Sequence, residues 1–286
     1  MPTKTLLIPY MLATASGVIG LFFPPFQYAT LVVCLLSVAL GLSLLIKRLN
    51  QHIWDVHLRS MRIIDMLDEN VVAAHAMHVV VSRFPTCDMP TSSWSMKFPN
   101  LHALLELLDR EEPKLIVEFG SGISTLLIAS WIQERGVGRL VSFDHDAEWA
   151  CKTKHYLDRH SLASVDVRVR PLKSIVSSGH RCIWYDTTED DLKSLSGVDL
   201  VVVDGPPAGA TGTPMSRLPA FEVLREQMSP KAVIVLDDAS RAGERSVASS
   251  WDKSNPDFEL SHIANLAILC RTDDGCSQVI GTDLDI

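Results

Sequence analysis

The hydrophobic residues of this chain are concentrated at its N-terminal end. No charged residue lies between Thr5 and Ile46, and Pro24-Pro25 divides this stretch into apolar runs at residues 6–23 and 26–46. As helices these runs would be about 27 and 32 Å long, enough to cross a hydrocarbon core of roughly 30 Å. The pattern predicts a transmembrane helical hairpin within residues 1–48.

Basic residues flank both outer ends of the predicted hairpin. Lys4 precedes the first run, and Lys47 and Arg48 follow the second. Positive charge favours the cytoplasmic side, so we expect a multi-pass protein of the cell (inner) membrane with the domain that follows the hairpin in the cytoplasm. One competing interpretation is a cleaved signal peptide, with residues 13–15 as the processing site, but it leaves the second run unexplained. A second is a buried helical hairpin in a soluble protein, but nothing else in the chain is suited to cover it.

Residues 49–99 form a second region, an amphipathic helical segment followed by a proline-punctuated linker. In its first part, apolar residues follow one another at alternating spacings of four and three residues, which places them on one side of a helix. Two interpretations remain open: a coiled-coil stalk that makes the protein a homo-oligomer, or helices that pack on the domain that follows. In the linker, Trp94 either anchors on that domain or caps a ligand pocket.

Residues 100–286 alternate between strand and helix patterns with short connections. This order is typical of a parallel sheet covered on both faces, so we predict one α/β domain with a doubly wound, Rossmann-like sheet. Asn100 is the expected N-cap of the first helix, residues 101–108. Strands are predicted at residues 115–119, 140–143, 165–169, 200–203, 232–236, 258–262 and 266–270, and helices at 124–135, 147–160, near 192–195 and at 220–228.

Charge and cysteine content narrow the function classes. The net charge of −8 argues against a nucleic-acid-binding surface. The six cysteines include no C-x-x-C pair, which is neither a zinc pattern nor a disulfide framework and suits a reducing compartment.

The most informative motif follows the first predicted strand and reads Glu118-Phe119-Gly120-Ser121-Gly122-Ile123-Ser124. A strand, a glycine turn and a helix bring backbone N–H groups close to a nucleotide-like ligand. A dinucleotide fingerprint would have a third glycine at position 125, where this chain has Thr125.

The motif resembles the first motif of class I S-adenosylmethionine-dependent methyltransferases. The resemblance implies that Gly120 and Gly122 lie against the methionine part of the cofactor and that Glu118 serves its ammonium end. Ser121 and Ser124 of the same motif are counted among the expected cofactor-binding residues.

A second carboxylate supports a nucleoside ligand. Asp144 ends the second predicted strand, where an acid can accept hydrogen bonds from both ribose hydroxyls. Asp146 is a close alternative that could instead cap the next helix. His145 is expected near the adenine, and Trp149 either lies there or has a packing role.

Three further acids follow the fourth and fifth predicted strands of the sheet. Neighbouring ends of parallel strands converge, so Asp204, Asp237 and Asp238 are expected to meet at one point, where a hard cation such as Mg²⁺ would neutralise them. The alternative is that they cap a helix and fix a turn. The arrangement is similar to metal-dependent O-methyltransferases, in which the ion draws a substrate hydroxyl into place, so Asp204 is the expected catalytic residue.

The Asp-Gly-Pro-Pro form at Asp204 looks closest to a bacterial branch of class I methyltransferases. Arg217, further along the chain, either recognises an anionic group on the acceptor or makes a structural contact. We therefore expect a membrane-tethered O-methyltransferase for a small-molecule, sugar (glycan) or lipid-linked hydroxyl. A non-catalytic membrane-anchored binding or scaffolding protein is the alternative, and an NAD-dependent oxidoreductase is a third.

Overall fold

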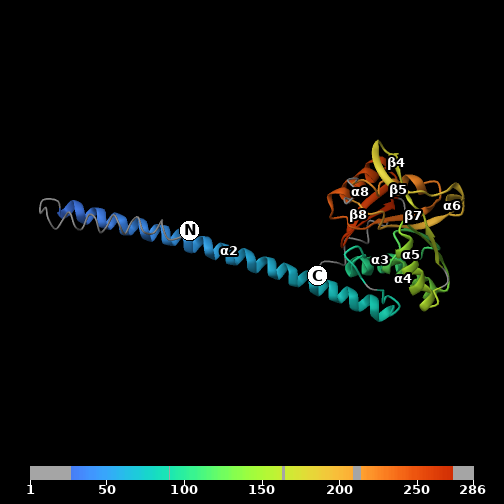
Figure 1. Ribbon diagram of the computed structural model, residues 1–286, viewed down its shortest axis with the longest axis horizontal. Coiled ribbons are helices and arrows are strands. Elements are labelled where there is room, and N and C mark those ends of the chain that lie inside the picture. The colour runs from blue at the N-terminus through green and yellow to red at the C-terminus, as the bar shows by residue number, and fades with distance from the viewer. Residues whose placement is uncertain (1–26, 90, 163–164, 209–213, 273–286) are drawn as a thin grey trace. The chain divides into compact units, whose positions relative to one another are not determined.

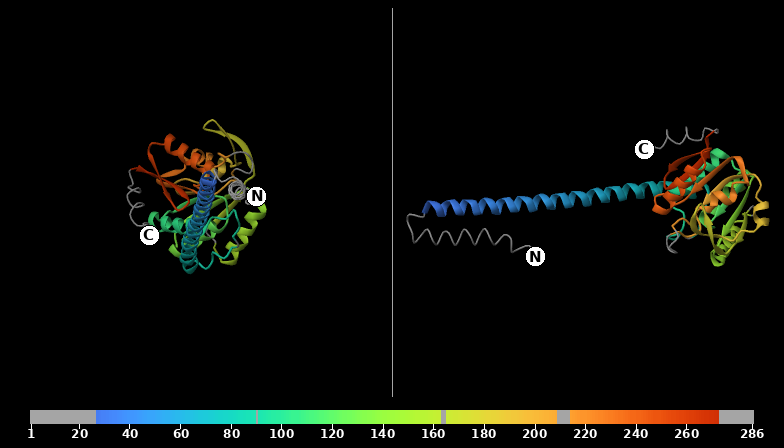
Figure 2. Two further views of the ribbon diagram at one scale, coloured as in Figure 1. Left: turned by 90° about the vertical axis from the view of Figure 1, so that its left-hand side faces the viewer. Right: turned by 90° about the horizontal axis from the view of Figure 1, so that it is seen from above.

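The computed structural model describes residues 27–89, 91–162, 165–208 and 214–272. The chain divides into two compact units, Met1–Asn70 and Val71–Ile286. A long helix makes up the described part of the first unit, and a layered α/β structure makes up the second (Figures 1 and 2). Every residue predicted to bind cofactor or metal belongs to the second unit.

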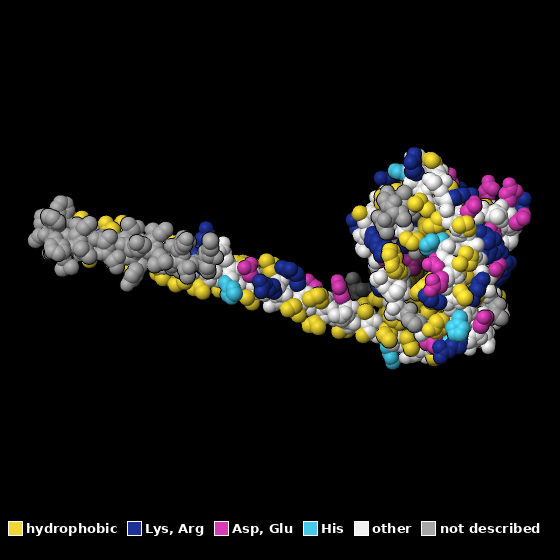
Figure 3. All heavy atoms as spheres, in the orientation of Figure 1, with side chains coloured by type: hydrophobic (Ala, Val, Ile, Leu, Met, Phe, Trp, Pro, Cys, Tyr) yellow, Lys and Arg dark blue, Asp and Glu magenta, His cyan; other side chains and the backbone are white. Residues whose placement is uncertain are grey.

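A single helix, α2 (Gln27–Arg83), contains the second predicted apolar run and the amphipathic segment after it. No proline occurs between Pro25 and Pro85, so nothing in this stretch removes a helical hydrogen bond. The helix includes an 18-residue window of mean hydropathy 2.6, long and apolar enough to cross a membrane. Hydrophobic side chains are exposed along it (Figure 3). The first predicted run, residues 6–23, lies outside the described residues, and so does the hairpin that depends on it.

The amphipathic segment has an exposed part and a buried part. Side chains at residues 49–72 are exposed, whereas Val80 and Phe84 are buried in the core of the second unit. The guanidinium of Arg83 pairs with Asp109 of α3 (Phe98–Glu111) and lies 2.5 Å from a carboxylate oxygen of Glu134. The end of the helix therefore packs on the domain as one interpretation predicts, and self-association through residues 49–72 stays a prediction.

The helix α3 begins earlier than predicted, and Asn100 is not its N-cap. Lys97 occupies the cap position, and Phe98-Pro99 starts the helix with proline in its first turn, where the missing N–H costs nothing. Asn100 lies within that first turn and is buried. Its side chain is directed into the protein, where it has a different role at the site.

The predicted Rossmann-like arrangement is confirmed. The described residues form a seven-stranded sheet in the order β3-β2-β1-β6-β7-β9-β8, in which β1, β2, β3, β6 and β7 are parallel and β9 and β8 are antiparallel. The strands are β1 (Leu115–Phe119), β2 (Arg139–Asp144), β3 (Val165–Val169), β6 (Val198–Val203), β7 (Met228–Leu236), β8 (Phe258–Ile263) and β9 (Leu266–Arg271). The helices between them are α4 (Ile123–Arg135), α5 (Ala147–Arg159), α6 (Glu189–Lys193), α7 (Pro219–Leu224) and α8 (Ala242–Ser254).

Alternating side chains of the strands supply two cores, one on each face of the sheet. On β6, Leu200 and Val202 pack with α3, α4 and α5, whereas Val201 and Val203 pack with α7 and α8. Parallel strands with both faces covered are nearly continuous apolar runs, and this is why their pattern is easy to recognise in the sequence.

One hairpin and two helices differ from the predictions. An antiparallel hairpin, β4 (Leu172–Ser177) with β5 (His180–Tyr185), was not predicted, nor was α8. The predicted helix at 220–228 is the shorter α7, because Met228 already pairs with Val198 as the first residue of β7. All three lie where polar residues interrupt the apolar pattern.

The turn after β1 packs directly on the end of β6. Gly120 has φ +99°, and a Cβ placed there would lie 3.1 Å from the carbonyl carbon of Asp204 and 3.2 Å from the backbone nitrogen of Gly205. Both the left-handed conformation and the close backbone contact require glycine. Gly120 thus brings the glycine turn next to the first acid of the predicted metal site.

We predict that Gly120→Ala destabilises the protein by about 2–5 kcal/mol, because backbone strain and overpacking add. Gly136→Ala is the matched control, since Gly136 has φ +69° but nothing within 4 Å of an added Cβ. The control should lose only the conformational part, about 1–2 kcal/mol. Denaturant unfolding of the two variants measures the difference, and equal losses would contradict the packing argument.

Candidate active site

A cavity of about 290 Å³ opens at the carboxyl ends of the parallel strands. Its lining comes from the glycine turn, from the residues that follow β2, from the ends of β5, β6 and β7, and from the linker before α3. Trp94 of that linker is among the lining residues and is exposed, so of its two predicted roles the structure places it at the pocket.

Asp144 organises the part of the cavity next to β2. Its Oδ2 accepts hydrogen bonds from the backbone N–H and the hydroxyl of Ser121, and its Oδ1 accepts one from the N–H of Asp146 at 2.9 Å. Asp146 itself caps α5 by accepting from the N–H groups of Glu148 and Trp149. The strand-end acid and the helix-capping acid are therefore distinct, as the sequence suggested.

Trp149 and His145 complete this part of the cavity. The indole N–H of Trp149 donates to the carbonyl oxygen of Ser121 at 2.7 Å, so this side chain both lines the cavity and holds the glycine turn. The ring of His145 lies beside the cavity, with Nδ1 3.6 Å from Oδ1 of Asp144.

Glu118 lies beneath the glycine turn and is fully buried. Three hydroxyls donate to its carboxylate at 2.6 Å, those of Ser124, Thr125 and Ser142. Burial raises the pKa of Glu118 to about 7, and the three hydrogen bonds oppose that shift. Its visible role is to tie β1, β2 and the start of α4 together.

The predicted cofactor residues thus separate into two groups. Gly120, Ser121, Asp144 and His145 line the cavity. Glu118, Gly122 and Ser124 are not among its lining residues in the described chain and instead build the turn from below.

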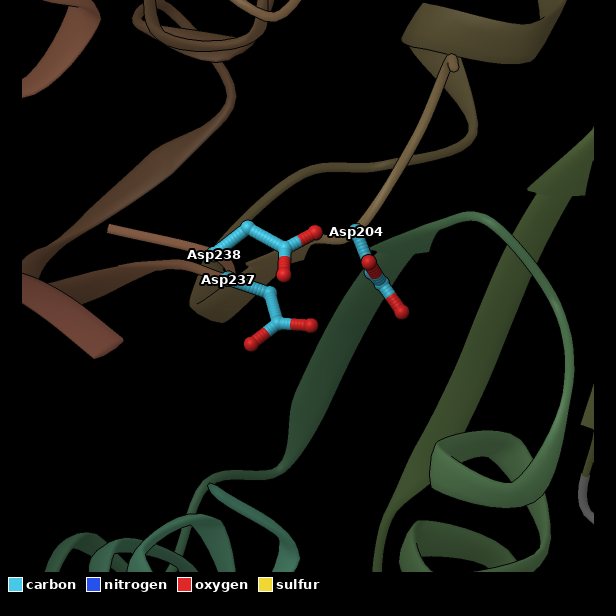
Figure 4. A group of neighbouring side chains, drawn as sticks. All are labelled: Asp204, Asp237 and Asp238. Atoms are coloured by element: carbon cyan, nitrogen blue, oxygen red, sulfur yellow. The ribbon is translucent and has the colours of Figure 1, made fainter. Parts of the chain in front are cut away.

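The three predicted metal acids do come together. Asp204 follows β6, and Asp237 and Asp238 follow β7. One carboxylate oxygen from each lies within 4.8 Å of the others, and Figure 4 shows all three side chains directed toward a common space. Asp204 and Asp238 line the cavity, whereas Asp237 lies behind them with 3% exposure.

Arg217 lies among these acids and is 3% exposed. It donates to the backbone oxygens of Asp204 at 2.9 Å and Asp237 at 3.0 Å. Its guanidinium is also 3.4 Å from a carboxylate oxygen of Asp204 and 3.6 Å from one of Asp238. Arg217 therefore makes the structural contact that one interpretation predicts, because it joins the ends of β6 and β7 and supplies positive charge inside the acidic cluster. It also lines the cavity, so recognition of an anionic group on the acceptor stays a prediction.

Burial and mutual repulsion raise the pKa of two of the acids. Burial is the larger cause for both Asp204 and Asp237, and the neighbouring carboxylates add to it. Arg217 opposes both shifts. Unshielded carboxylates this close retain a proton unless a cation joins them.

Two site residues were missed by the sequence analysis. Asn100 donates from its side-chain amide to Oδ1 of Asp237 at 2.5 Å and accepts from the N–H of Asn265 at 3.0 Å. Tyr185, the last residue of β5, is buried and lines the cavity. The only sequence signal for a buried role of Asn100 is that it is a polar residue within an apolar helix pattern. No local pattern indicates that Tyr185 belongs to the site.

Comparison with known proteins gives one sequence match and several similar folds. Residues 117–239 match the family model described as "Methyltransferase domain". No curated protein sequence matches the chain.

Among solved structures, a methyltransferase from Geobacter sulfurreducens is 16% identical with a TM-score of 0.43, and the alignment covers 74% of this chain and 97% of the other. The Podospora anserina methyltransferase PaMTH1, bound to SAH, is 14% identical with a TM-score of 0.48 and coverages of 74% and 94%. An O-methyltransferase from Bacillus cereus, in complex with SAH, is 17% identical with a TM-score of 0.46 and coverages of 69% and 90%.

The sequence match spans the glycine turn after β1, the acid that ends β2 and the three acids after β6 and β7. Over residues 117–239 this chain is therefore similar to a methyltransferase domain, in agreement with the resemblance that its glycine-turn motif has to class I S-adenosylmethionine-dependent methyltransferases.

Proposed function

We propose that this chain is a membrane-tethered enzyme that transfers the methyl group of S-adenosylmethionine to a hydroxyl oxygen of a small-molecule, sugar or lipid-linked acceptor. The proposal is carried by one observation, that a single cavity contains both the glycine turn and the acidic cluster. Gly120 and Ser121 line one part of it, and Asp204 and Asp238 line another. A methyl donor on the first part would face an acceptor held by the second.

Asp144 is suited to hold the sugar of the cofactor. Each carboxylate oxygen can accept two hydrogen bonds. Among the described residues, Oδ2 receives two from Ser121 and Oδ1 receives one from Asp146. One acceptor position on Oδ1 is thus left for a ribose hydroxyl, in a carboxylate whose direction is already fixed.

The acidic cluster fits a divalent cation with oxygen ligands, such as Mg²⁺, held by Asp204, Asp237 and Asp238. Oxygens within 4.8 Å of one another are close enough for small side-chain rotations to bring all three to one Mg²⁺ ion at roughly 2.0–2.1 Å. Such an ion would lower the pKa of an acceptor hydroxyl. The cluster has four carboxylates, those of Asp204, Asp237, Asp238 and Glu244, and two guanidiniums, those of Arg217 and Arg241. If all six groups are ionised, the cluster has a net charge of −2, which favours a divalent cation.

The protein's own contribution to the reaction is to orient the acceptor oxygen. The contact between its backbone and Gly120 would bring Asp204 next to a methyl donor held by the glycine turn. The hydrogen bond from Arg217 to the carbonyl oxygen of Asp204 restrains the backbone at this position. A hydroxyl held by Asp204 and Asp238 would therefore lie on the side of the cavity that faces the glycine turn.

Thr125 argues against the NAD-dependent alternative. It occupies the place of the third glycine of a dinucleotide fingerprint and is fully buried. Its hydroxyl accepts from the N–H of Gly122 at 2.8 Å and donates to Glu118 at 2.6 Å. This side chain is part of the support of the turn and takes the place of the glycine that lets helix and strand pack closely in a dinucleotide-binding fold.

We predict that the full chain in detergent binds S-adenosylmethionine and that Asp144→Asn weakens the binding about 10- to 100-fold, the range expected for a hydrogen bond to a charged group. Calorimetry measures both. Asp158→Asn, an exposed position on α5, is the matched control and should bind as the wild type does. Absence of binding by the wild type, or tighter binding of NAD, would rule out the enzyme proposed here.

For the metal, we predict that the wild type binds Mn²⁺, used as a paramagnetic probe for Mg²⁺, and that Asp204→Asn and Asp238→Asn each weaken binding at least about tenfold by removing a charged ligand. Electron paramagnetic resonance of free Mn²⁺ gives the affinities. Asp252→Asn, exposed on α8, is the control. Equal Mn²⁺ affinity in all four proteins would show that the cluster is not a metal site.

For the tether, we predict that the full chain stays in the membrane fraction after an alkaline carbonate wash, because an apolar helix of this length is held by the hydrocarbon core. A chain lacking residues 1–48 should move to the soluble fraction. Recovery of the full chain in the wash supernatant would contradict a membrane-spanning α2.

A further inference from the structure

The buried residue Tyr185 has a hydroxyl group that the fold itself does not use. The side chain is 1% exposed, and among the described residues its Oη has no hydrogen-bond partner. An unpaired buried hydroxyl is unfavourable, because it has lost its water without gaining a partner. Phenylalanine would fill the same space without that cost.

The ring of Tyr185 is held in one orientation by its neighbours. Its centroid lies 5.4 Å from that of Phe119, 5.1 Å from that of Trp184 and 6.4 Å from that of His145. The hydroxyl contacts Gly205 so closely that a Cβ at that position would collide with it. Tyr185 therefore holds its hydroxyl against Gly205, and both residues line the same cavity as Asp204.

The phenol of Tyr185 keeps its proton near neutral pH and is therefore a hydrogen-bond donor. Burial raises its pKa well above the ordinary value, and the negative charge of Asp144 is the next cause. The other charged groups that face it are Arg217, which opposes the shift, and Asp204 and Glu118, which add to it. A neutral hydroxyl between acids cannot act as a base, but it can donate to a neutral oxygen.

We propose that Tyr185 binds the nucleoside half of the cofactor by donating a hydrogen bond from Oη to a sugar oxygen. A sugar hydroxyl both donates and accepts, and here Asp144 offers an acceptor while Tyr185 offers a donor. The two side chains come from different elements, β2 and β5, and both line the same cavity. The inference rests on the proposed function, since it assumes that S-adenosylmethionine occupies this cavity.

The test compares Tyr185→Phe with the wild type, both as full chains in detergent. The variant should bind S-adenosylhomocysteine about tenfold more weakly by calorimetry. It should lose the same factor for 5′-methylthioadenosine, which keeps the nucleoside but lacks the amino acid. Without ligand, its melting temperature should be equal to that of the wild type or higher, because an unpaired buried hydroxyl has been removed.

Tyr156→Phe is the matched control. Tyr156 is a partly buried tyrosine on α5 whose ring packs against the core, and it is not among the residues that line the cavity. The control should leave both affinities unchanged.

Each other outcome overturns the proposal in a distinguishable way. Unchanged affinity of Tyr185→Phe, with binding intact in the wild type, would remove Tyr185 from the site but leave the proposed function standing. Loss for S-adenosylhomocysteine alone would place the hydroxyl at the amino acid and not at the sugar. A lower melting temperature or an unfolded variant would make the hydroxyl structural. No binding by the wild type would overturn the proposed function as well.

Discussion

The close contact between the turn after β1 and the backbone after β6 is the constraint on which the site depends. A Cβ added to Gly120 would lie only 3.1 Å from the carbonyl carbon of Asp204. No side chain at position 120 therefore fits between the two strand ends. Because the strands are parallel neighbours, this contact unites the turn that would bind the cofactor with the acid that would orient the acceptor. A methyl transfer needs both within reach of one another, and here the main chain alone secures it.

The charges of the site are partly balanced within the fold, and Arg217 is central to this balance. Three carboxylates within 4.8 Å of one another would repel strongly if nothing opposed them. Arg217 bonds to the backbone of two of these acids, and Asn100 donates to Asp237, the most buried one. The remaining negative charge is concentrated at the wall of the cavity, where a cation or a polar acceptor can reach it. This is the physical basis for reading the cluster as functional and not merely as a set of helix caps.

The sequence was sufficient wherever the structural cause was local. Apolar runs located the parallel strands, and the glycine turn and Asp204 were recognisable because each directly follows such a run. Asn100 and Tyr185 were missed because their roles depend on residues far away along the chain. Asn100 donates to Asp237, which is 137 residues away. The hydroxyl of Tyr185 contacts Gly205, 20 residues further along the chain. The β4–β5 hairpin that carries Tyr185 lacks a clear alternation, since only a few of its residues are buried.

Glu118 belongs to the recognisable motif, but the hydrogen bonds of its side chain could not be predicted from that motif. The resemblance assigned its carboxylate to the cofactor, but three hydroxyls surround that carboxylate beneath the turn. A buried acid with three donors organises the start of α4, and Thr125 links it to the N–H of Gly122. The turn is therefore held from below by Glu118 and from the side by Trp149, which leaves Ser121 and Asp144 as the surface that a ligand would meet. Because the turn is already held rigidly, ligand binding does not have to supply the free energy needed to order it.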